Sequence, residues 1–240
     1  NKNLEDLFHL ILAISDNHHK ESNFFEKIMQ IFIFLNNDIQ LFFSDLDIFK
    51  FFMTNQLLIY YLIQNKIIIP SQECINIIFA YIPRSLTQSI KMQYKYFLYP
   101  VIKPYLDEKK QEEIERNIKR KTKMDLNEFQ QNCQNGENDS IICKLIRKDS
   151  INEFITYVNQ MSIPLKTEIK ESIFETNSFL VSKRPTLFEY AAFFGSVKIF
   201  KYLTMNKIKI KQTLWKYAIH GRNSEIIHLI EENVGNQNVS

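Results

Sequence analysis

The sequence predicts an all-α fold, an α-solenoid in which helix–turn–helix units stack in series. Its 240 residues include only 4 glycines and 6 prolines, too few for the many tight turns of an all-β protein. Apolar residues recur at helical spacing, and one helix–turn–helix pattern repeats after 27 residues near the C-terminus. We expect three regions: an N-terminal helical array (1–106), a charged helix and flexible loop (107–138), and a set of repeats (139–240).

The N-terminal array reads as short helices joined by short links. Asn23, with Glu26 three residues later, has the spacing of a capping box, and Ser44 with Asp47 repeats that signal. The predicted helices span Leu4–Ser15, Asn23–Leu35, Ile48–Met53, Gln56–Gln64 and Gln72–Tyr81. Helices of this length with short connections are typical of an α-solenoid.

The segment Asp107–Glu128 is dense in charge, with acidic residues first and basic residues last, an order that suits the helix dipole. Glu112–Arg116 and Glu115–Lys119 are spaced to form ion pairs along one helix face. We interpret the segment as a solvated helix or hinge between two halves, with a charged contact surface as the alternative. The polar stretch Gln130–Asn138 is predicted to be a flexible loop.

The repeat is clearest at Ala191, which is followed 27 residues later by Ala218. The other pairs at this offset are Thr186 with Thr213, Phe188 with Trp215, Tyr190 with Tyr217, Phe200 with Ile227, and Leu203 with Ile230. Small alanines would let the first helix of one unit approach the next closely, while Phe188 and Trp215 fill the space between units. One unit cannot cover its own apolar face, so the pattern predicts stacking of neighbours.

A fainter copy lies upstream at an offset of 46 residues, where Asp149-Ser150 matches Gly195-Ser196. The same offset pairs Ile151, Phe154 and Tyr157 with Val197, Phe200 and Leu203. The extra residues fall within Val158–Arg184, the connection to the next unit. We call such a projecting connection between units a finger, and we expect this one to be enlarged or to contain an added helix. The finger between the last two units, Lys207–Gln212, is short by comparison.

The stretch Thr186–Gly195, Thr-Leu-Phe-Glu-Tyr-Ala-Ala-Phe-Phe-Gly, resembles the opening of an ankyrin repeat, usually Thr-Pro-Leu-His-x-Ala-Ala-x-x-Gly. Thr186, Phe188, Ala191, Ala192 and Gly195 fall on the motif, whereas Leu187 and Glu189 depart from it. Lys148–Gly235 also resembles an ankyrin-repeat family of unassigned function that is greatly expanded in trichomonad parasites. The phrases that carry this resemblance are Glu175–Leu180, Glu189–Gly195 and Tyr217–Leu229. It implies degenerate ankyrin-like repeats with shortened fingers and protein binding, and it transfers no catalytic residues.

Composition and motifs favour no enzymatic chemistry. A formal net charge of +3 gives no strong attraction to nucleic acid or an anionic membrane. Cys74, Cys133 and Cys143 are too scattered for a zinc site or a disulfide framework, and they indicate a reducing compartment. The adjacent His18-His19 lacks further ligands at metal-binding spacing. Because no phosphate-binding glycine loop or nucleophile motif is present, we predict no enzyme, no cofactor and no metal site.

We therefore expect a non-catalytic, intracellular and cytoplasmic scaffold that binds a protein partner through its repeats. The tentative partner surface is Arg184, Lys207, Lys209 and Lys211, and the repeat-packing residues are Phe188, Ala191, Ala192, Gly195, Trp215 and Ala218. A permanent structural subunit of a cytoskeletal or parasite-specific assembly is the first alternative. Association with nucleic acid is the second and less favoured, since the lysines and tyrosines of Lys91–Lys103 are better explained by helix packing.

Two expectations concern the chain as a whole. The apolar run Ile28–Leu35 is too short to span a membrane, so we predict no transmembrane segment. The chain opens at Asn1 without a methionine, and we expect it to be a piece of a longer protein.

Overall fold

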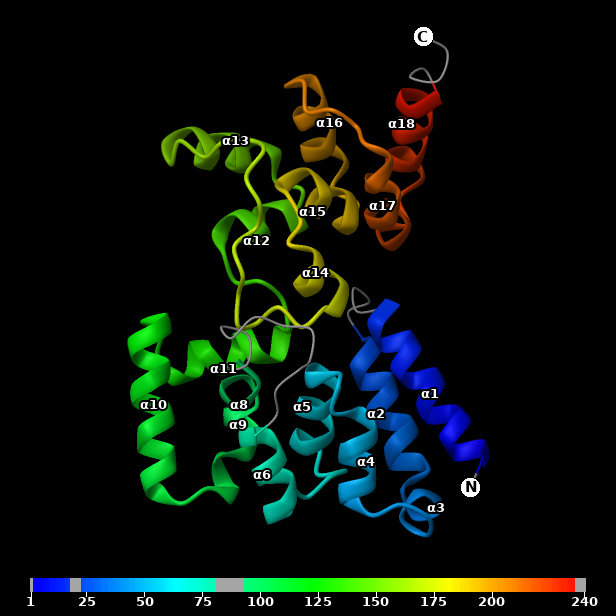
Figure 1. The fold of residues 1–240 in the computed structure, drawn as a ribbon, viewed down its shortest axis with the longest axis vertical. Helices are drawn as coiled ribbons and strands as arrows, with labels where there is room; N and C mark the ends of the chain where they lie inside the picture. The colour runs from blue at the N-terminus through cyan, green and yellow to red at the C-terminus, as the bar shows by residue number, and fades with distance from the viewer. Residues whose placement is uncertain (1, 18–22, 81–92, 236–240) are drawn as a thin grey trace. The chain divides into compact units, whose positions relative to one another are not determined.

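The structure is a computed structural model that describes residues 2–17, 23–80 and 93–235 (Figure 1). Regular secondary structure in these residues is helical throughout, which confirms the all-α prediction. Their one β-type feature is an isolated antiparallel bridge between Glu168 and Thr186. No helix in these ranges combines the length and apolar character needed to cross a membrane. The chain forms two compact units, residues 1–137 with 173–182 and residues 138–172 with 183–240.

The first unit is built around α5 (Gln56–Gln64), whose bounds match the prediction. Its other helices are α1 (Lys2–Asn17), α2 (Phe24–Phe34), α3 (Asn36–Gln40), α4 (Asp45–Phe52), α6 (Gln72–Ala80), α8 (Gln93–Phe97), α9 (Tyr99–Ile102), α10 (Glu108–Thr122), α11 (Leu126–Asn135) and most of α14 (Ser178–Lys183), with the 3-10 turn η1 (Lys103–Tyr105). Helix α5 packs on α2, α4, α9 and α11. Because it is apolar on nearly every side, it forms the centre of this core.

Of the two capping boxes predicted in this unit, only the one at Ser44 forms. Ser44 accepts a hydrogen bond from the Asp47 N–H, and the Asp47 carboxylate accepts one from the Ser44 N–H, so the predicted capping box starts α4. The prediction at Asn23 is wrong, because its side chain accepts no hydrogen bond from the first turn of α2. The Asn23 backbone has ψ of 17°, outside the extended region in which a capping side chain reaches back to the helix.

The charged segment belongs to the first unit, and the predicted loop is a helix. Ile114 and Ile118 of α10 are buried, and so are Phe129 and Cys133 of α11, four residues apart on one helix face. This thin apolar stripe packs into the core, so Gln130–Asn138 is no flexible loop: α11 continues to Asn135.

Neither predicted ion pair along α10 occurs among the described residues. Glu115 instead binds Lys103 Nζ at 2.7 Å and accepts a hydrogen bond from Tyr99 Oη at 2.6 Å. The bond from Lys103, followed by that from Tyr99, lowers the pKa of Glu115. Arg116 donates to the backbone carbonyl of Glu112 rather than to its carboxylate. The two contacts of Glu115 join α10 to α9 and to the turn η1 that follows it.

Gly136 ends α11 in a conformation that favours glycine, with φ of 64°. Its carbonyl accepts hydrogen bonds from the N–H and hydroxyl of Thr176, at 3.1 and 2.8 Å. A Cβ at this position would lie 2.6 Å from Leu57 Cδ2 and 2.9 Å from Thr176 Oγ1. The backbone conformation therefore favours glycine here, and a Cβ would fit only if the Leu57 and Thr176 side chains shifted.

Replacing Gly136 with alanine should lower the free energy of unfolding by about 2 kcal/mol, because left-handed backbone strain adds to overpacking. Urea denaturation followed by far-UV circular dichroism measures the change. Asn135→Ala, at the exposed neighbouring position, is the matched control and should be near neutral. A Gly136→Ala protein as stable as the control would contradict this account of the turn.

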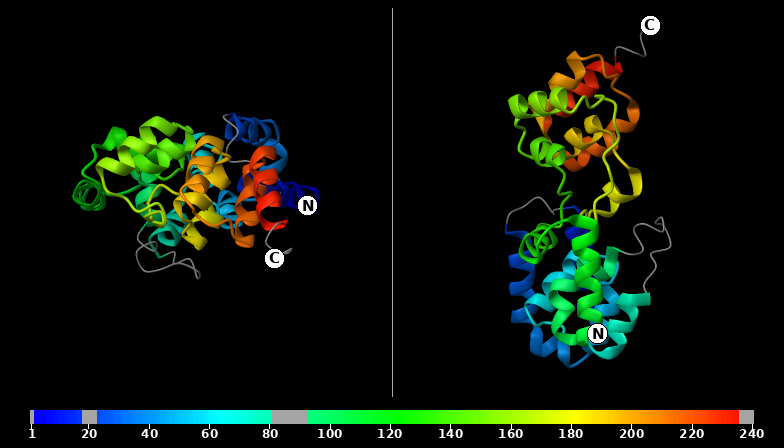
Figure 2. Two further views of the ribbon diagram at one scale, coloured as in Figure 1. Left: turned by 90° about the horizontal axis from the view of Figure 1, so that it is seen from above. Right: turned by 90° about the vertical axis from the view of Figure 1, so that its left-hand side faces the viewer.

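The second unit contains three helix pairs: α12 (Ile141–Arg147) with α13 (Ile151–Gln160), α15 (Leu187–Phe194) with α16 (Val197–Met205), and α17 (Trp215–Gly221) with α18 (Ser224–Gly235). Helix α15 packs between α12 and α17, and α16 packs between α13 and α18. Figure 1 shows this order, and the left view of Figure 2 shows the outer helices from above in green, orange and red. Each pair is thus one layer of a stack.

The three layers share one turn geometry. The inner helix of each layer is followed by a left-handed residue, with φ of 49° at Asp149, 68° at Gly195 and 49° at Arg222. These positions are related by the offsets of 46 and 27 residues found in the sequence. The Asp149 carboxylate also accepts hydrogen bonds from the N–H groups of Lys198 and Ile199, so it caps the outer helix of the next layer.

Candidate functional site

The inner helix α15 starts with a complete capping box. Thr186 Oγ1 accepts from the Glu189 N–H at 3.3 Å, and Glu189 Oε2 accepts from the Thr186 N–H at 2.8 Å and hydroxyl at 2.9 Å. The equivalent of Glu189 one repeat later is Lys216, so Thr213 has no carboxylate partner at this spacing and α17 is preceded by the 3-10 turn η2 (Gln212–Leu214). The box fixes the direction of the Glu189 carboxylate.

The region between the first two layers is both an enlarged finger and an added helix. Residues 163–170 run back toward α15, where Ile169 N–H donates to the Pro185 carbonyl and Leu187 N–H donates to the Thr167 carbonyl. The short helix α14 follows the finger. This antiparallel contact brings Leu165 and Lys166 alongside the start of α15, next to the later connection Lys207–Lys211.

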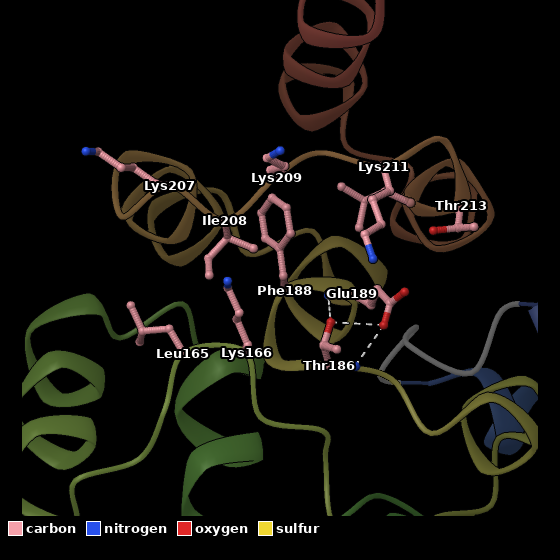
Figure 3. A pocket seen from close by; sticks show the side chains of 11 residues that line it. Leu165, Lys166, Thr186, Phe188, Glu189, Lys207, Ile208, Lys209, Lys211 and Thr213 are labelled. Atoms are coloured by element: carbon pink, nitrogen blue, oxygen red, sulfur yellow. Dashed lines mark hydrogen bonds between the residues drawn. The ribbon is translucent and has the colours of Figure 1, made fainter.

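A pocket of about 340 Å³ lies where these segments meet (Figure 3). We call it the lysine pocket; it is lined by Leu165, Lys166, Thr186, Phe188, Glu189, Lys207, Ile208, Lys209, Lys211, Thr213 and Leu214. The ring of Phe188 stands at its centre (Figure 3). Its walls are therefore apolar, with four lysines and a single carboxylate around them.

The lysines are not equivalent. Lys166 and Lys211 point toward the pocket from opposite sides of Phe188, while Lys209 lies at its rim and Lys207 points away (Figure 3). None of the four forms an ion pair with any described residue. The one acidic side chain in the lining, Glu189, is engaged in the capping box. The pocket thus has an excess of positive charge that the described part of the chain does not neutralise.

Four residues were predicted to form the partner surface, and the structure brings three of them together. Lys207, Lys209 and Lys211 line the lysine pocket, but Arg184 does not. Arg184 lies beside the finger and pairs with Glu171 at 2.6 Å. Lys166 was missed by sequence reasoning, because it lies in the finger insertion, which has no counterpart in the 27-residue register.

The residues predicted to pack repeats lie on the inner helices. Ala191, Ala192 and Ala218 are buried, and Phe188 is also buried. Phe188 stacks on Phe200 of its own layer, with ring centroids 4.5 Å apart. Trp215 is only half-buried; the neighbouring Leu214 is the buried residue at this point of the third layer.

Two glycines allow the close approach of α15 and α17. Gly195 takes the left-handed conformation at the end of α15, and its N–H donates to the Ala192 carbonyl at 3.2 Å. A Cβ at Gly221 would lie 2.2 Å from that same carbonyl oxygen. The two inner helices therefore meet backbone to backbone at this point.

The electrostatic effect of Glu189 extends to the third layer. Burial, and secondly the Glu189 carboxylate, raise the pKa of Tyr217 to about 12. Tyr217 is consequently a neutral hydroxyl across the physiological range and contributes no charge beside the pocket.

A second cavity in this unit, of about 490 Å³, lies between α13 and the finger. Its lining includes Tyr157, Met161, Ile163 and Leu187, with Glu168 and Lys170 as its only charged members. One acid and one base leave it without net charge. It therefore differs in kind from the lysine pocket.

No cluster of three or more His, Cys, Asp or Glu side chains suited to a metal occurs within the described ranges, and His18-His19 lies outside them. All three cysteines are buried and none takes part in a disulfide, and burial raises the pKa of the Cys133 thiol. Tyr94, Tyr96 and Tyr99 are buried, so their rings form part of the first core; Lys91 lies outside the described residues.

No protein-family model, curated protein or solved structure matches this chain.

Proposed function

We propose that this chain is a non-catalytic scaffold of ankyrin-like repeats that binds a protein partner through the lysine pocket and its rim. The observation that carries the proposal is the set of four lysines without ion-pair partners around an apolar pocket. Exposed charges of one sign attract a partner of the other sign, and an apolar recess adds contact energy. Fingers suit this role because they lie outside the layer-to-layer packing.

The ankyrin-like assignment is supported by the inner helices. Their alanines permit close stacking, Thr186 caps α15 at the first position of the motif, and Gly195 occupies its usual place at the helix end. The left-handed turn shared by Asp149, Gly195 and Arg222 supports three units in one register. The departures are Leu187 and Glu189 within the motif, Lys216 one repeat later, and the enlarged first finger.

Selection of binders from a displayed protein-fragment library on the intact chain tests this function. We expect selected fragments to lose at least about tenfold in affinity against Lys166→Glu/Lys211→Glu. The matched control is Lys144→Glu/Lys198→Glu, at exposed lysines of the same unit outside the pocket. Fragments that bind the pocket variant and the wild type equally would refute the pocket as the docking site.

A permanent structural subunit of a larger assembly is a second candidate, favoured by exposed apolar side chains on the first unit. Phe34 is 85% exposed, and Leu41 and Phe42, which follow α3, are exposed as well. Such side chains commonly mark protein interfaces. Sedimentation of the isolated chain as a stable monomer at micromolar concentration would count against this candidate and leave the first one intact.

A further inference from the structure

We infer that the lysine pocket takes a short acidic peptide segment in which one apolar side chain is flanked by acidic residues. This inference rests on the proposed function, and it specifies the chemistry of the partner. The juxtaposition that carries it is an apolar recess with a lysine directed inward on each side.

The volume of the pocket limits what can enter. At about 340 Å³ it lies at the small end of ligand pockets, which range from roughly 300 to 1,000 Å³. Leu165 and Ile208 supply apolar walls near the Phe188 ring (Figure 3), and Leu214 is a further apolar residue of the lining. A recess of this size and polarity suits one leucine or phenylalanine side chain of a partner, with the partner backbone outside.

The charges of the lysines determine which residues the partner should carry on either side of its apolar side chain. Lys166 comes from the first finger and Lys211 from the second, and their ammonium groups approach Phe188 from opposite sides (Figure 3). An extended peptide that places its apolar residue against the partly exposed Leu165 and Ile208 would carry its neighbouring residues toward these two lysines. Carboxylates are the complementary groups there, because four lysines outnumber the single carboxylate of Glu189 in the lining.

The same geometry favours a peptide over single-stranded nucleic acid. Binding of nucleic acid depends on aromatic faces on which bases stack. The Phe188 ring is stacked on Phe200 and only 4% of the residue is exposed, so it offers no free platform. The remaining apolar walls are aliphatic, which suits a side chain rather than a base.

Fluorescence anisotropy with the labelled peptide Gly-Ser-Asp-Glu-Phe-Glu-Asp-Ser-Gly tests the inference on the intact chain. At salt of about 0.15 M we expect saturable binding that weakens at least tenfold with Lys166→Glu/Lys211→Glu. The control Lys144→Glu/Lys198→Glu should bind as the wild type does. A peptide with serine in place of phenylalanine should bind about tenfold to a hundredfold more weakly, through loss of the apolar contact. Circular dichroism melts check that both double variants remain folded.

Several results would overturn the inference. They are absence of peptide binding at millimolar concentration, equal loss in the two double variants, and equal affinity for the serine peptide. A labelled single-stranded oligonucleotide that binds more tightly, with the same dependence on Lys166 and Lys211, would assign the pocket to nucleic acid instead. If library binders depend on these lysines but carry no acidic–apolar–acidic motif, this inference fails while the proposed function stands.

Discussion

Replacing Gly221 with alanine should destabilise the second unit by about 2–3 kcal/mol. The new methyl group would lie 2.2 Å from the Ala192 carbonyl oxygen, well inside contact distance. That oxygen belongs to the helix backbone and already accepts the Gly195 N–H, so it cannot turn aside as a side chain would. Alanine gains about 1 kcal/mol over glycine in helix propensity, but overpacking costs typically 1–3 kcal/mol and occasionally more. Strain therefore outweighs propensity here.

The only tryptophan, Trp215, lies in this unit and reports its unfolding by fluorescence. Gly221→Ala should lower the midpoint of that transition by roughly 5–10 °C. Ile219→Ala changes a 65% exposed residue of the same helix and should leave the midpoint nearly unchanged. A Gly221→Ala protein that melts with the wild type would show that α15 and α17 do not approach in this way.

Replacing Phe200 with alanine should have the largest effect, a loss of about 3–5 kcal/mol. Phe200 is fully buried in α16 and stacks on Phe188, which connects the outer helix of the second layer to its inner helix. Removing the ring leaves a cavity that the close-packed layer cannot fill. Since Phe188 also lines the lysine pocket, the same change should disturb the pocket.

Urea denaturation, again followed by Trp215 fluorescence, measures this cost. Met205→Ala on the same helix removes a 75% exposed side chain and should change the free energy of unfolding by less than about 0.5 kcal/mol. A cost for Phe200→Ala near that of the control would exclude the stacked pair as a main contributor to the unit.

Helix starts that depend on near neighbours could be predicted from the sequence. The Ser44–Asp47 box is local, and α5 has the predicted bounds because its apolar run is bordered by polar residues. The helix α11 was not predicted, because only Phe129 and Cys133 form its buried stripe, and a helix so polar is held mainly by the core it packs against.

Only the part of the candidate site that lies within the 27-residue repeat could be predicted from the sequence. Lys207, Lys209 and Lys211 stand out as an alternating connection between repeats. Lys166 lies in the finger insertion, and only the antiparallel contact near Pro185 and Thr186 brings it to the pocket. The direction of each lysine depends on three-dimensional packing, which repeat spacing does not encode.

The order of the two units along the chain limits which fragments of this protein contain a complete unit. Residues 173–182 belong to the first unit although residues on both sides of them belong to the second, so no single cut yields both units whole. A fragment that ends at Glu137 would lack Phe174, whose ring packs against Phe129 with centroids 5.1 Å apart. Such a truncation would expose core surface and aggregate, so interaction mapping needs point substitutions in the full-length chain rather than deletion series.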